Sequence, residues 1–317
     1  MVNLSFFEQN PTVPQTQLRS DFLDKHKITL TVIREDCIDK EVSGNKFRKL
    51  KYNFKEAIKG NYKSILTFGG AYSNHIAAVA KAGNICNIPT IGVIRGEELG
   101  KNLKHTLLKN TTLAKAKEYG MQFKFISREQ YRAKNDQNFL QQLKNEFPQA
   151  YIIPEGGTNQ LAVKGCQEIL PKENKADFIC ASVGTGGTLA GLCNSSNPLQ
   201  KVIGFPALKG TFVSAEIGTW TRKNNWELVT SYHFGGYGKV TDELITFMNA
   251  FYKAYGILLD PIYTGKLFYG IFDMIRNGYF KKNTRIFAIH TGGLQGIVAM
   301  NQKLAAKNKP LILTQSE

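Results

Sequence analysis

The chain has 317 residues, 42% of them hydrophobic and 11% aromatic, which is enough for two domains with sizeable cores and excludes a disordered polymer. The formal net charge is +16, but the lysines form no block of five or six and no nucleic-acid module motif occurs. We therefore expect a solvated, lysine-rich surface that suits anionic small molecules, and no nucleic-acid partner.

Cysteine usage and the N-terminal segment bear on the compartment. The five cysteines are odd in number and form no Cys-x-x-Cys pair, which argues against a disulfide framework and a metal site and favours a reducing cytoplasm. The first residues lack the basic and apolar regions of a signal peptide, and no apolar run reaches the length of a membrane span. We expect a cytoplasmic protein without a membrane partner.

The first half of the chain alternates short apolar runs with segments of helical period. The expected strands are 64–70, 89–96, 121–127 and 150–157. Helices are expected at 73–85, at about 100–119, ending at Gly120, and after Ser127, which is a candidate N-cap. This order predicts a first parallel βα series.

A second series follows in the other half. It is expected to contain a helix at 161–170, a strand at 177–184, a helix at 187–194, a strand at 201–208, a β-rich segment at 226–234, helices at about 241–255 and 264–277, a strand at 285–290 and a last helix at 295–307. Two such series predict an α/β fold with two open, mainly parallel twisted sheets and flanking helices.

A glycine-rich loop lies between the strand and the helix of "ICASVGTGGTLAGL", residues 179–192. Its backbone N–H groups and the helix N-terminus suit one compact phosphate. The nucleoside-triphosphate loop would need Gly-Lys-Ser/Thr at its end, and the dinucleotide fingerprint would need glycine in place of Leu189 and a later acid. At this point a tight turn without a ligand explains the loop equally well.

Two further Gly-Gly turns follow strands. In "TFGGAYSNH", the side chains and N–H groups of Ser73, Asn74 and His75 start a helix and can meet a carboxylate or ring oxygen, or serve only as caps. The other turn is "HTGGLQG", residues 290–296. Because open α/β sheets bind ligands at the carboxyl ends of their strands, the three loops together predict one ligand crevice.

Lys46 follows Gly44-Asn45 at the start of an expected helix in "SGNKFRKL". By itself it is either a surface charge or the amine of a covalent cofactor site. Together with a compact phosphate loop and polar helix starts, it suits pyridoxal 5′-phosphate, which has an aldehyde, a monophosphate and a ring to be oriented.

These segments resemble the fold type II pyridoxal-phosphate enzymes, whose fold is like that of the tryptophan synthase β subunit, and within them the 1-aminocyclopropane-1-carboxylate deaminase/D-cysteine desulfhydrase family. "SGNKFRKL" resembles the segment with the Schiff-base lysine, here Lys46, and "GGAYSNH" resembles the segment that places Ser73 near the substrate and Asn74 at the cofactor's ring oxygen. The resemblance implies that Ser73, Asn74 and His75 receive the carboxylate of a small amino-acid substrate.

The same resemblance implies the remaining site residues. "VGTGGTLAG" looks like the phosphate loop, and "GGYGK" and "DPIYTGK" are similar to the segments that bring active-site tyrosines. The expected phosphate-binding residues are Gly184, Thr185, Gly186, Gly187 and Thr188. Tyr263 is expected beside the cofactor ring and Tyr237 near it, to assist proton transfer or exclude water, although core packing would also account for either tyrosine. Thr264 or Thr291 is the expected partner of the ring nitrogen, and His290 is expected to be structural.

The resemblance also implies organisation and activity. It implies a large cofactor-binding domain made of residues 1–48 and 159–317, a smaller inserted domain at 49–158, and a homodimer. Thr264 and Thr291 stand where the cyclopropane deaminases tend to have Glu and Leu, which favours a lyase that converts D-cysteine to pyruvate, ammonia and sulfide. The alternatives are the 1-aminocyclopropane-1-carboxylate deaminase, a nucleotide-dependent oxidoreductase, and a non-catalytic basic binding protein on the same scaffold.

Overall fold

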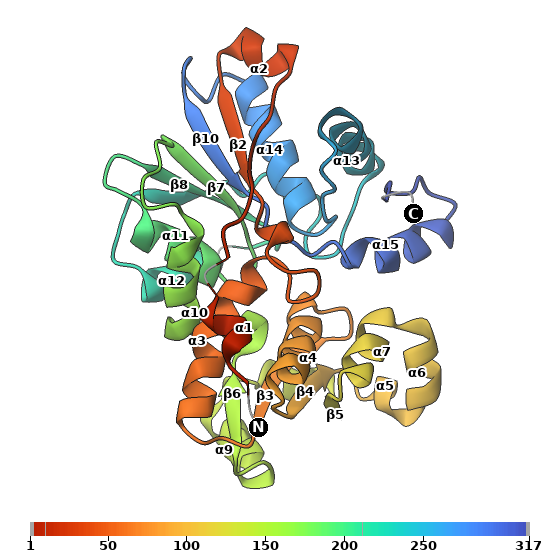
Figure 1. Ribbon diagram of the computed structural model, residues 1–317. Coiled ribbons are helices and arrows are strands. Elements are labelled where there is room, and N and C mark those ends of the chain that lie inside the picture. The colour runs from red at the N-terminus through yellow and green to blue at the C-terminus, as the bar shows by residue number, and fades with distance from the viewer. Residues whose placement is uncertain (1–2, 10, 211, 315–317) are drawn as a thin grey trace. The chain divides into compact units, whose positions relative to one another are not determined.

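The computed structural model describes residues 3–9, 11–210 and 212–314, and the chain divides into two compact units (Figure 1). The small unit comprises Met1–Pro11 and Lys49–Ala162, and the large unit comprises Thr12–Arg48 and Val163–Glu317. Within the described residues, no helix is both long enough and apolar enough to cross a membrane, and no cluster of His, Cys, Asp and Glu suits a metal ion.

The small unit is built on a four-stranded parallel sheet of order β5-β4-β3-β6. Its strands are β3 (Ser64–Gly70), β4 (Thr90–Arg95), β5 (Gln122–Ile126) and β6 (Ala150–Ile153). Its helices are α1 (Ser5–Glu8), most of α3 (Asn45–Lys59), α4 (Asn74–Cys86), α5 (Glu98–Lys101), α6 (Leu103–Lys109), α7 (Thr111–Glu118), α8 (Arg128–Arg132) and α9 (Gln137–Glu146), with a 3₁₀ turn η2 at Glu155–Gly157. The α4 helix packs closely because Gly83 has no side chain: a Cβ there would lie 2.3 Å from Cγ2 of Thr90 on β4.

The expected helix over 100–119 is wrong as a single element. The segment forms the separate helices α5, α6 and α7, and each of the two later ones begins at an asparagine. Asn102 accepts a hydrogen bond from the backbone N–H of His105 at 3.1 Å, and Asn110 accepts one from Leu113 at 2.9 Å. Asparagine is a strong N-cap, so each one starts a new helix where the hydrophobic period alone suggested continuity. Ser127 caps α8 as expected, in a capping box with Gln130.

The large unit is built on a six-stranded sheet of order β1-β2-β10-β7-β8-β9, in which β1 alone runs antiparallel to its neighbour. Its strands are β1 (Gln15–Gln17), β2 (Thr29–Ile33), β7 (Phe178–Val183), β8 (Lys201–Pro206), β9 (Trp226–Leu228) and β10 (Arg285–Ile289). Its helices are α2 (Asp21–His26), most of α10 (Gln160–Cys166), α11 (Gly187–Ser195), α12 (Phe212–Trp220), α13 (Asp242–Tyr255), α14 (Thr264–Arg276) and α15 (Gly296–Ala305), with 3₁₀ turns η1 (Glu35–Cys37) and η3 (Gln167–Ile169). The expected class, α/β with two mainly parallel sheets, is confirmed.

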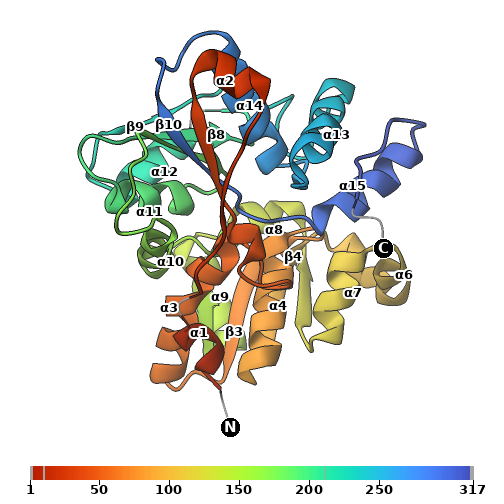
Figure 2. The same ribbon diagram turned by 45° about the horizontal axis from the view of Figure 1, so that its top comes forward.

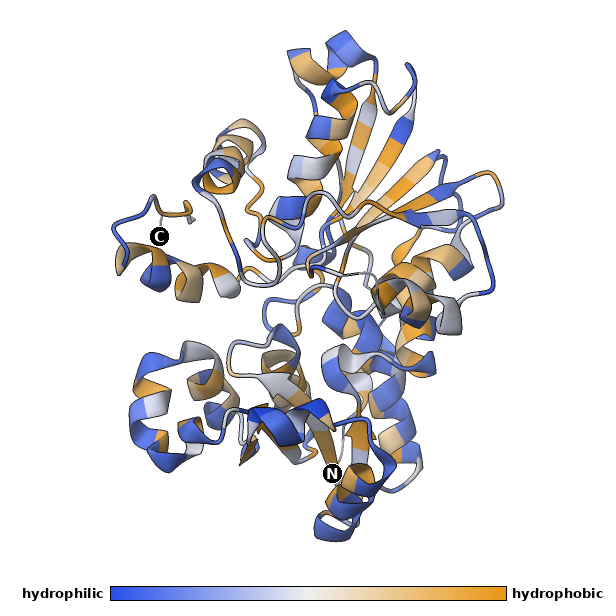
Figure 3. Ribbon diagram, turned by 180° about the vertical axis from the view of Figure 1, so that it is seen from behind, coloured by the Kyte–Doolittle hydropathy of each residue, from blue (hydrophilic) through white to orange (hydrophobic). Residues whose placement is uncertain are grey.

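Helices cover both faces of the six-stranded sheet (Figure 2). Along β7, Ile179 and Ala181 belong to a core with Leu189 of α11, whereas Cys180 between them belongs to a core with Leu267 of α14. Successive strand residues point to opposite faces, so a strand buried on both sides reads as a continuous apolar run. Figure 3 shows these strands mostly in the hydrophobic colour.

Two segments differ from the expectation, one in the large unit and one in the small unit. Of the β-rich segment 226–234, only Trp226–Leu228 is a strand, and the chain then turns with positive φ at Phe234 and Gly235. The other difference concerns the described residues 3–9 and 11, which were expected in the large domain and belong to the small unit. There the ring of Phe7 packs 5.1 Å from that of Phe54 on α3, centroid to centroid. The outer bounds of the expected large domain, 1 and 317, lie outside the described residues.

Candidate active site

Sheet register brings two of the three glycine turns together in the large unit. The strands β7 and β10 are parallel neighbours, with Ala181 opposite Ile289. The segments that follow them, 184–188 and 291–293, therefore leave the same edge of the sheet. A hydrogen bond between the hydroxyls of Ser182 and Thr291, 3.2 Å between their oxygens, joins the two strand ends.

The N-terminus of α3, which carries Lys46, is fixed on the turn after β10. Gly44 has φ +65° and lies so close to this turn that a Cβ would be 1.9 Å from the carbonyl oxygen of Thr291. The backbone N–H of Asn45 donates to the same oxygen at 3.3 Å. Only glycine accommodates both the positive φ and this approach, so the glycine before Asn45 and Lys46 is dictated by packing.

Lys46 is half-buried and lies beside the glycine-rich loop. Its Nζ donates to Oδ1 of Asn45 at 3.3 Å, and Nδ2 of Asn45 donates to Oγ1 of Thr188 at 2.9 Å. The structure therefore brings Lys46 and Thr188 together through one side chain. Sequence reasoning gave Asn45 no role, although its place in the "GNK" motif was a usable signal.

The glycine-rich loop presents backbone donors. Gly186 is the N-cap of α11 with φ +84°, and within the described chain no side chain caps this helix end. The first N–H groups of an α-helix have no partner inside the helix and carry positive potential, so they suit a phosphate. Gly184, at the start of the loop, allows Tyr263 to approach closely: a Cβ on Gly184 would lie 3.2 Å from Oη of Tyr263. Lys46, these donors and an aromatic ring fit the amine, phosphate and ring requirements of pyridoxal phosphate.

Tyr263 and Tyr237 pack together in the large unit. Their ring centroids are 6.1 Å apart and the rings are tilted by 67°, an edge-to-face arrangement. Tyr263 is partly buried against Gly184, whereas Tyr237 is 47% exposed. The structure thus places Tyr263 against the loop that begins at Gly184, and Tyr237 against Tyr263.

Asp260 fixes the start of α14 and with it the position of Tyr263. Its carboxylate accepts hydrogen bonds from the backbone N–H groups of Ile262, Tyr263 and Thr264, at 2.8–2.9 Å, and from the hydroxyl of Thr264 at 2.8 Å. Burial raises the pKa of the Asp260 carboxyl, and the hydrogen bonds from Thr264, Tyr263 and Ile262 oppose that rise. Sequence reasoning missed Asp260, although an Asp-Pro pair before a helix is a cap signal.

The two candidate partners of the ring nitrogen differ in their surroundings. Thr264 is fully buried. Its hydroxyl donates to the carboxylate of Asp260 and accepts a hydrogen bond from the backbone N–H of Asp260 at 2.7 Å. The hydroxyl of Thr291 pairs with the neutral hydroxyl of Ser182. Of the two, Thr291 is joined directly to the segment that carries Lys46.

Ser73, Asn74 and His75 lie in the small unit, at the N-terminus of α4. Ser73 is the N-cap, and its Oγ accepts from the backbone N–H of Ile76 at 3.4 Å. The ring of His75 is buried, with Nε2 2.7 Å from Oγ1 of Thr67, and it packs against Gly157. Because the ring is buried, the group of His75 that could meet a ligand at the helix start is its backbone N–H and not its ring.

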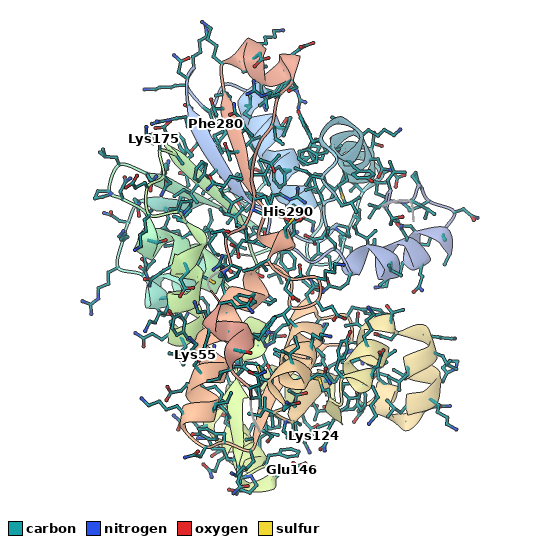
Figure 4. The ribbon with its side chains drawn as sticks, in the orientation of Figure 1. Lys55, Lys124, Glu146, Lys175, Phe280 and His290 are labelled. Atoms are coloured by element: carbon teal, nitrogen blue, oxygen red, sulfur yellow. The ribbon has the colours of Figure 1, made fainter. Side chains whose placement is uncertain are left out.

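His290 is buried at the end of β10, where Figure 4 labels it. Its Nε2 lies 2.7 Å from the carbonyl oxygen of Leu258, and its Nδ1 lies 3.3 Å from Oδ1 of Asp36. These contacts tie the strand end to η1 and to the segment before α14. They account for His290 as a structural residue.

Comparisons with known proteins identify the family and its cofactor. The family model of pyridoxal-phosphate dependent enzymes matches residues 10–292. A bifunctional mitochondrial D-cysteine desulfhydrase/1-aminocyclopropane-1-carboxylate deaminase of Arabidopsis thaliana is 30% identical over 303 residues, covering 87% of this chain and 75% of that protein. A 1-aminocyclopropane-1-carboxylate deaminase of Rhizobium rhizogenes is 26% identical, covering 86% and 88%.

Among solved structures, a homologue of 1-aminocyclopropane-1-carboxylate deaminase matches with a TM-score of 0.79 and 28% identity, covering 93% of this chain and 94% of that one. A serine racemase of Dictyostelium discoideum matches with a TM-score of 0.63 at 17% identity, which is evidence for a shared fold.

Proposed function

The chain belongs to the pyridoxal-phosphate dependent enzymes and, within them, to the 1-aminocyclopropane-1-carboxylate deaminase/D-cysteine desulfhydrase family, and from this premise we propose that it is a D-cysteine desulfhydrase. It would convert D-cysteine and water to pyruvate, ammonia and hydrogen sulfide. Pyridoxal phosphate is the cofactor, and when bound it supplies a ring that accepts the electron pair left on Cα after proton removal.

The amides of the glycine-rich loop would hold the cofactor's phosphate, and Lys46 would hold its aldehyde carbon. The support is the short chain of contacts from Lys46 through Asn45 to Thr188, at 3.3 and 2.9 Å. Backbone donors at the start of α11 bind an anion without placing a second cation near Lys46. Tyr263, fixed by the Asp260 cap and lying against Gly184, would flank the ring.

Lys46 would then serve as the base. With the cofactor and an amino acid bound, the free Nζ of Lys46 would take the proton from Cα of the amino acid. The electron pair on Cα forms a double bond to Cβ, and the Cβ–S bond breaks with its pair leaving on sulfur. A free lysine has a pKa near 10.4, so this role requires an environment that favours the neutral amine at neutral pH.

Substrate binding is assigned to the start of α4. The hydroxyl of Ser73, the amide of Asn74 and the backbone N–H of His75 would bind the substrate carboxylate, since a helix N-terminus favours negative charge. Asn74 would also donate to the ring oxygen. Tyr237, exposed at the edge of the Tyr263 ring, would deliver a proton or exclude water.

The observation that carries the choice of substrate is that both candidate partners of the ring nitrogen are hydroxyls. Thr264 stands where the cyclopropane deaminases tend to have Glu, and Thr291 pairs with the neutral hydroxyl of Ser182. A carboxylate at the ring nitrogen would hold a proton there and strengthen the ring as an electron acceptor, which ring opening of a cyclopropane needs. A hydroxyl is a weaker partner and is sufficient where the leaving group is a thiolate. The relative from Arabidopsis thaliana carries both activities in its name, so the cyclopropane deaminase is the second candidate.

The test supplies the purified, cofactor-loaded chain with D-cysteine, L-cysteine or 1-aminocyclopropane-1-carboxylate, and measures sulfide, pyruvate and 2-oxobutanoate. We expect sulfide and pyruvate in equal amounts from D-cysteine, and none from a Lys46→Ala variant. Turnover of 1-aminocyclopropane-1-carboxylate alone would refute the choice of substrate. Turnover of none of the three would refute the proposed function.

A further inference from the structure

The loop that carries Tyr237, residues 232–239, has an unusual backbone. Four of its residues, Phe234, Gly235, Gly236 and Gly238, have positive φ. Two consecutive turns make up this conformation: the N–H of Gly236 donates to the carbonyl of His233 at 3.0 Å, and the N–H of Lys239 donates to the carbonyl of Gly236 at 3.2 Å. Glycines permit such turns but do not enforce them, because glycine has the most conformational freedom to lose.

The two ends of this loop are held in different ways. The first is anchored by aromatic side chains: Tyr232 donates to Oδ2 of Asp273 at 2.8 Å, and the ring of Phe234 packs edge-on to that of Tyr269 at 4.9 Å. The second end consists of glycines and the exposed Tyr237. It therefore has little side-chain area to bury.

A buried lysine beneath the loop spans both turns. Lys266, on the first turn of α14, is 2% exposed, and its Nζ donates to the carbonyl of His233 at 2.9 Å and to that of Gly236 at 2.8 Å. These are the same two carbonyls that close the consecutive turns. Burial lowers the pKa of Lys266 to about 8, and the nearby carboxylate of Asp260 opposes this shift. Burying an amine without a paired carboxylate is costly, so its retention calls for a reason.

We propose that Lys266 is a positioning residue for Tyr237: its Nζ locks the two turns of the 232–239 loop and so holds Tyr237 edge-on against Tyr263. The α14 helix then carries the residues that fix the positions of both tyrosines. Its start sets Tyr263 through the Asp260 cap, and one turn later Lys266 sets the loop of Tyr237. One rigid element thus fixes both tyrosines, as a precise site requires. The inference rests on the proposed function in so far as Tyr237 acts on the substrate.

The first test is local order, measured by hydrogen exchange of the cofactor-loaded chain. Lys266→Met keeps the length and removes the donors, so the amides of 232–239 should exchange about tenfold faster or more, whereas β7 and β8 should keep wild-type rates. Lys253→Met, at an exposed lysine of α13, is the matched control and should leave both unchanged. Unchanged exchange in the loop of Lys266→Met, or an equal increase throughout β7 and β8, would overturn the proposal.

The second test is a double-mutant cycle on kcat/KM with D-cysteine. Lys266→Met should lower kcat/KM by roughly 10- to 100-fold, as a misplaced catalytic group does, and should have little further effect in a Tyr237→Ala background. An undiminished loss in that background would contradict action through Tyr237. If Lys266→Met does not fold, Lys266→Gln replaces it in both tests, because its shorter, neutral side chain does not reproduce the two Nζ contacts. The exchange result is independent of turnover, so failure of the proposed function and failure of this inference are distinguishable.

Discussion

At the scale of single residues, the site depends on two glycines that approach each other. A Cβ on Gly44 would lie 1.9 Å from the carbonyl oxygen of Thr291, and one on Gly292 would lie 2.7 Å from Oγ of Ser43. Both residues have positive φ. This contact brings the segment before Lys46 onto the turn after β10, so the position of the Lys46 amine follows from the absence of two side chains.

Gly44→Ala should therefore destabilise the protein and displace Lys46. The positive φ costs about 1 kcal/mol, and the clash with a backbone oxygen raises the expected loss in unfolding free energy to about 3 kcal/mol or more. Denaturant unfolding measures this loss, and a cofactor titration by absorbance should show weaker binding. Gly278→Ala is the control, because Gly278 has φ +73° with nothing within 4 Å of its Cβ position. Equal losses in the two variants would show that the contact with Thr291 is unimportant.

Sequence reasoning reached some of these residues and not others. Lys46 and the 184–188 loop were found because each lies in a local motif with an unusual composition. The contact between Gly44 and Thr291 was not found, because 247 positions separate the two residues and only the pairing of β10 with its neighbours brings them together. The role of Lys266 could not be predicted for another reason: it is one of 41 Lys and Arg residues, and only tertiary packing buries it.

At the scale of elements, α14 organises one side of the site. Asp260 satisfies three backbone N–H groups at its start, where an α-helix has donors without internal partners. The same helix then presents Tyr263, Thr264 and Lys266 within its first turn or just before it. A substitution of Asp260 should therefore shift the positions of all three residues.

Asp260→Ala should cost about 2 kcal/mol or more of unfolding free energy, since it removes a buried cap and leaves the N–H groups of Tyr263 and Thr264 without their acceptor. It should also lower kcat through Tyr263. Asp242→Ala, at the exposed start of α13, is the matched comparison and should cost less than about 1 kcal/mol. Thermal unfolding of both variants decides the matter, and a similar shift in the two would argue against a special role of the Asp260 cap.

The buried amine of Lys266 predicts a pH dependence of stability. Its pKa is lowered from 10.5 to about 8 in the folded chain. Below pH 8 the amine is protonated in both states and the folded state bears the full cost of the buried charge. Above pH 10.5 it is neutral in both states and this cost is absent. The contribution of Lys266 to the unfolding free energy should therefore rise between pH 8 and 10.5.

The measurement is the unfolding free energy of the wild-type chain minus that of Lys266→Met across this pH range. Subtraction removes the titration of the other lysines. The difference should move in favour of the wild type as pH rises. A flat difference would mean that the pKa of Lys266 is the same in both states, and a falling one that folding raises it; either would contradict the prediction.

Element boundaries show where local patterns were sufficient. The strand 64–70 was predicted with the bounds that the structure gives, because a short, mostly apolar run at 65–68 lies between a polar turn and Gly-Gly. The helix at 100–119 failed because its lysines and leucines keep a helical period through Asn102 and Asn110, whose capping contacts break it. The 226–234 segment failed because its aromatic residues, which favour strands, serve here to anchor a loop.

At the scale of the whole molecule, each unit has its own sheet, and the candidate site residues are distributed over both. Lys46, the glycine-rich loop and both tyrosines belong to the large unit, and Ser73, Asn74 and His75 belong to the small unit. A homodimer and a cytoplasmic location remain proposals. For the dimer, light scattering should give twice the chain mass of 35.4 kDa, and the mass of a single chain would contradict it.

The central claim is that Lys46 is the amine that binds pyridoxal phosphate. Borohydride reduction of the cofactor-loaded chain fixes the cofactor to that amine, and mass spectrometry of the resulting peptides identifies the modified residue. We predict that the label is on Lys46, in the peptide that contains Gly44 and Asn45, and that it is absent from Lys46→Ala. Label on another lysine of the wild-type chain, or none after loading, would contradict the account.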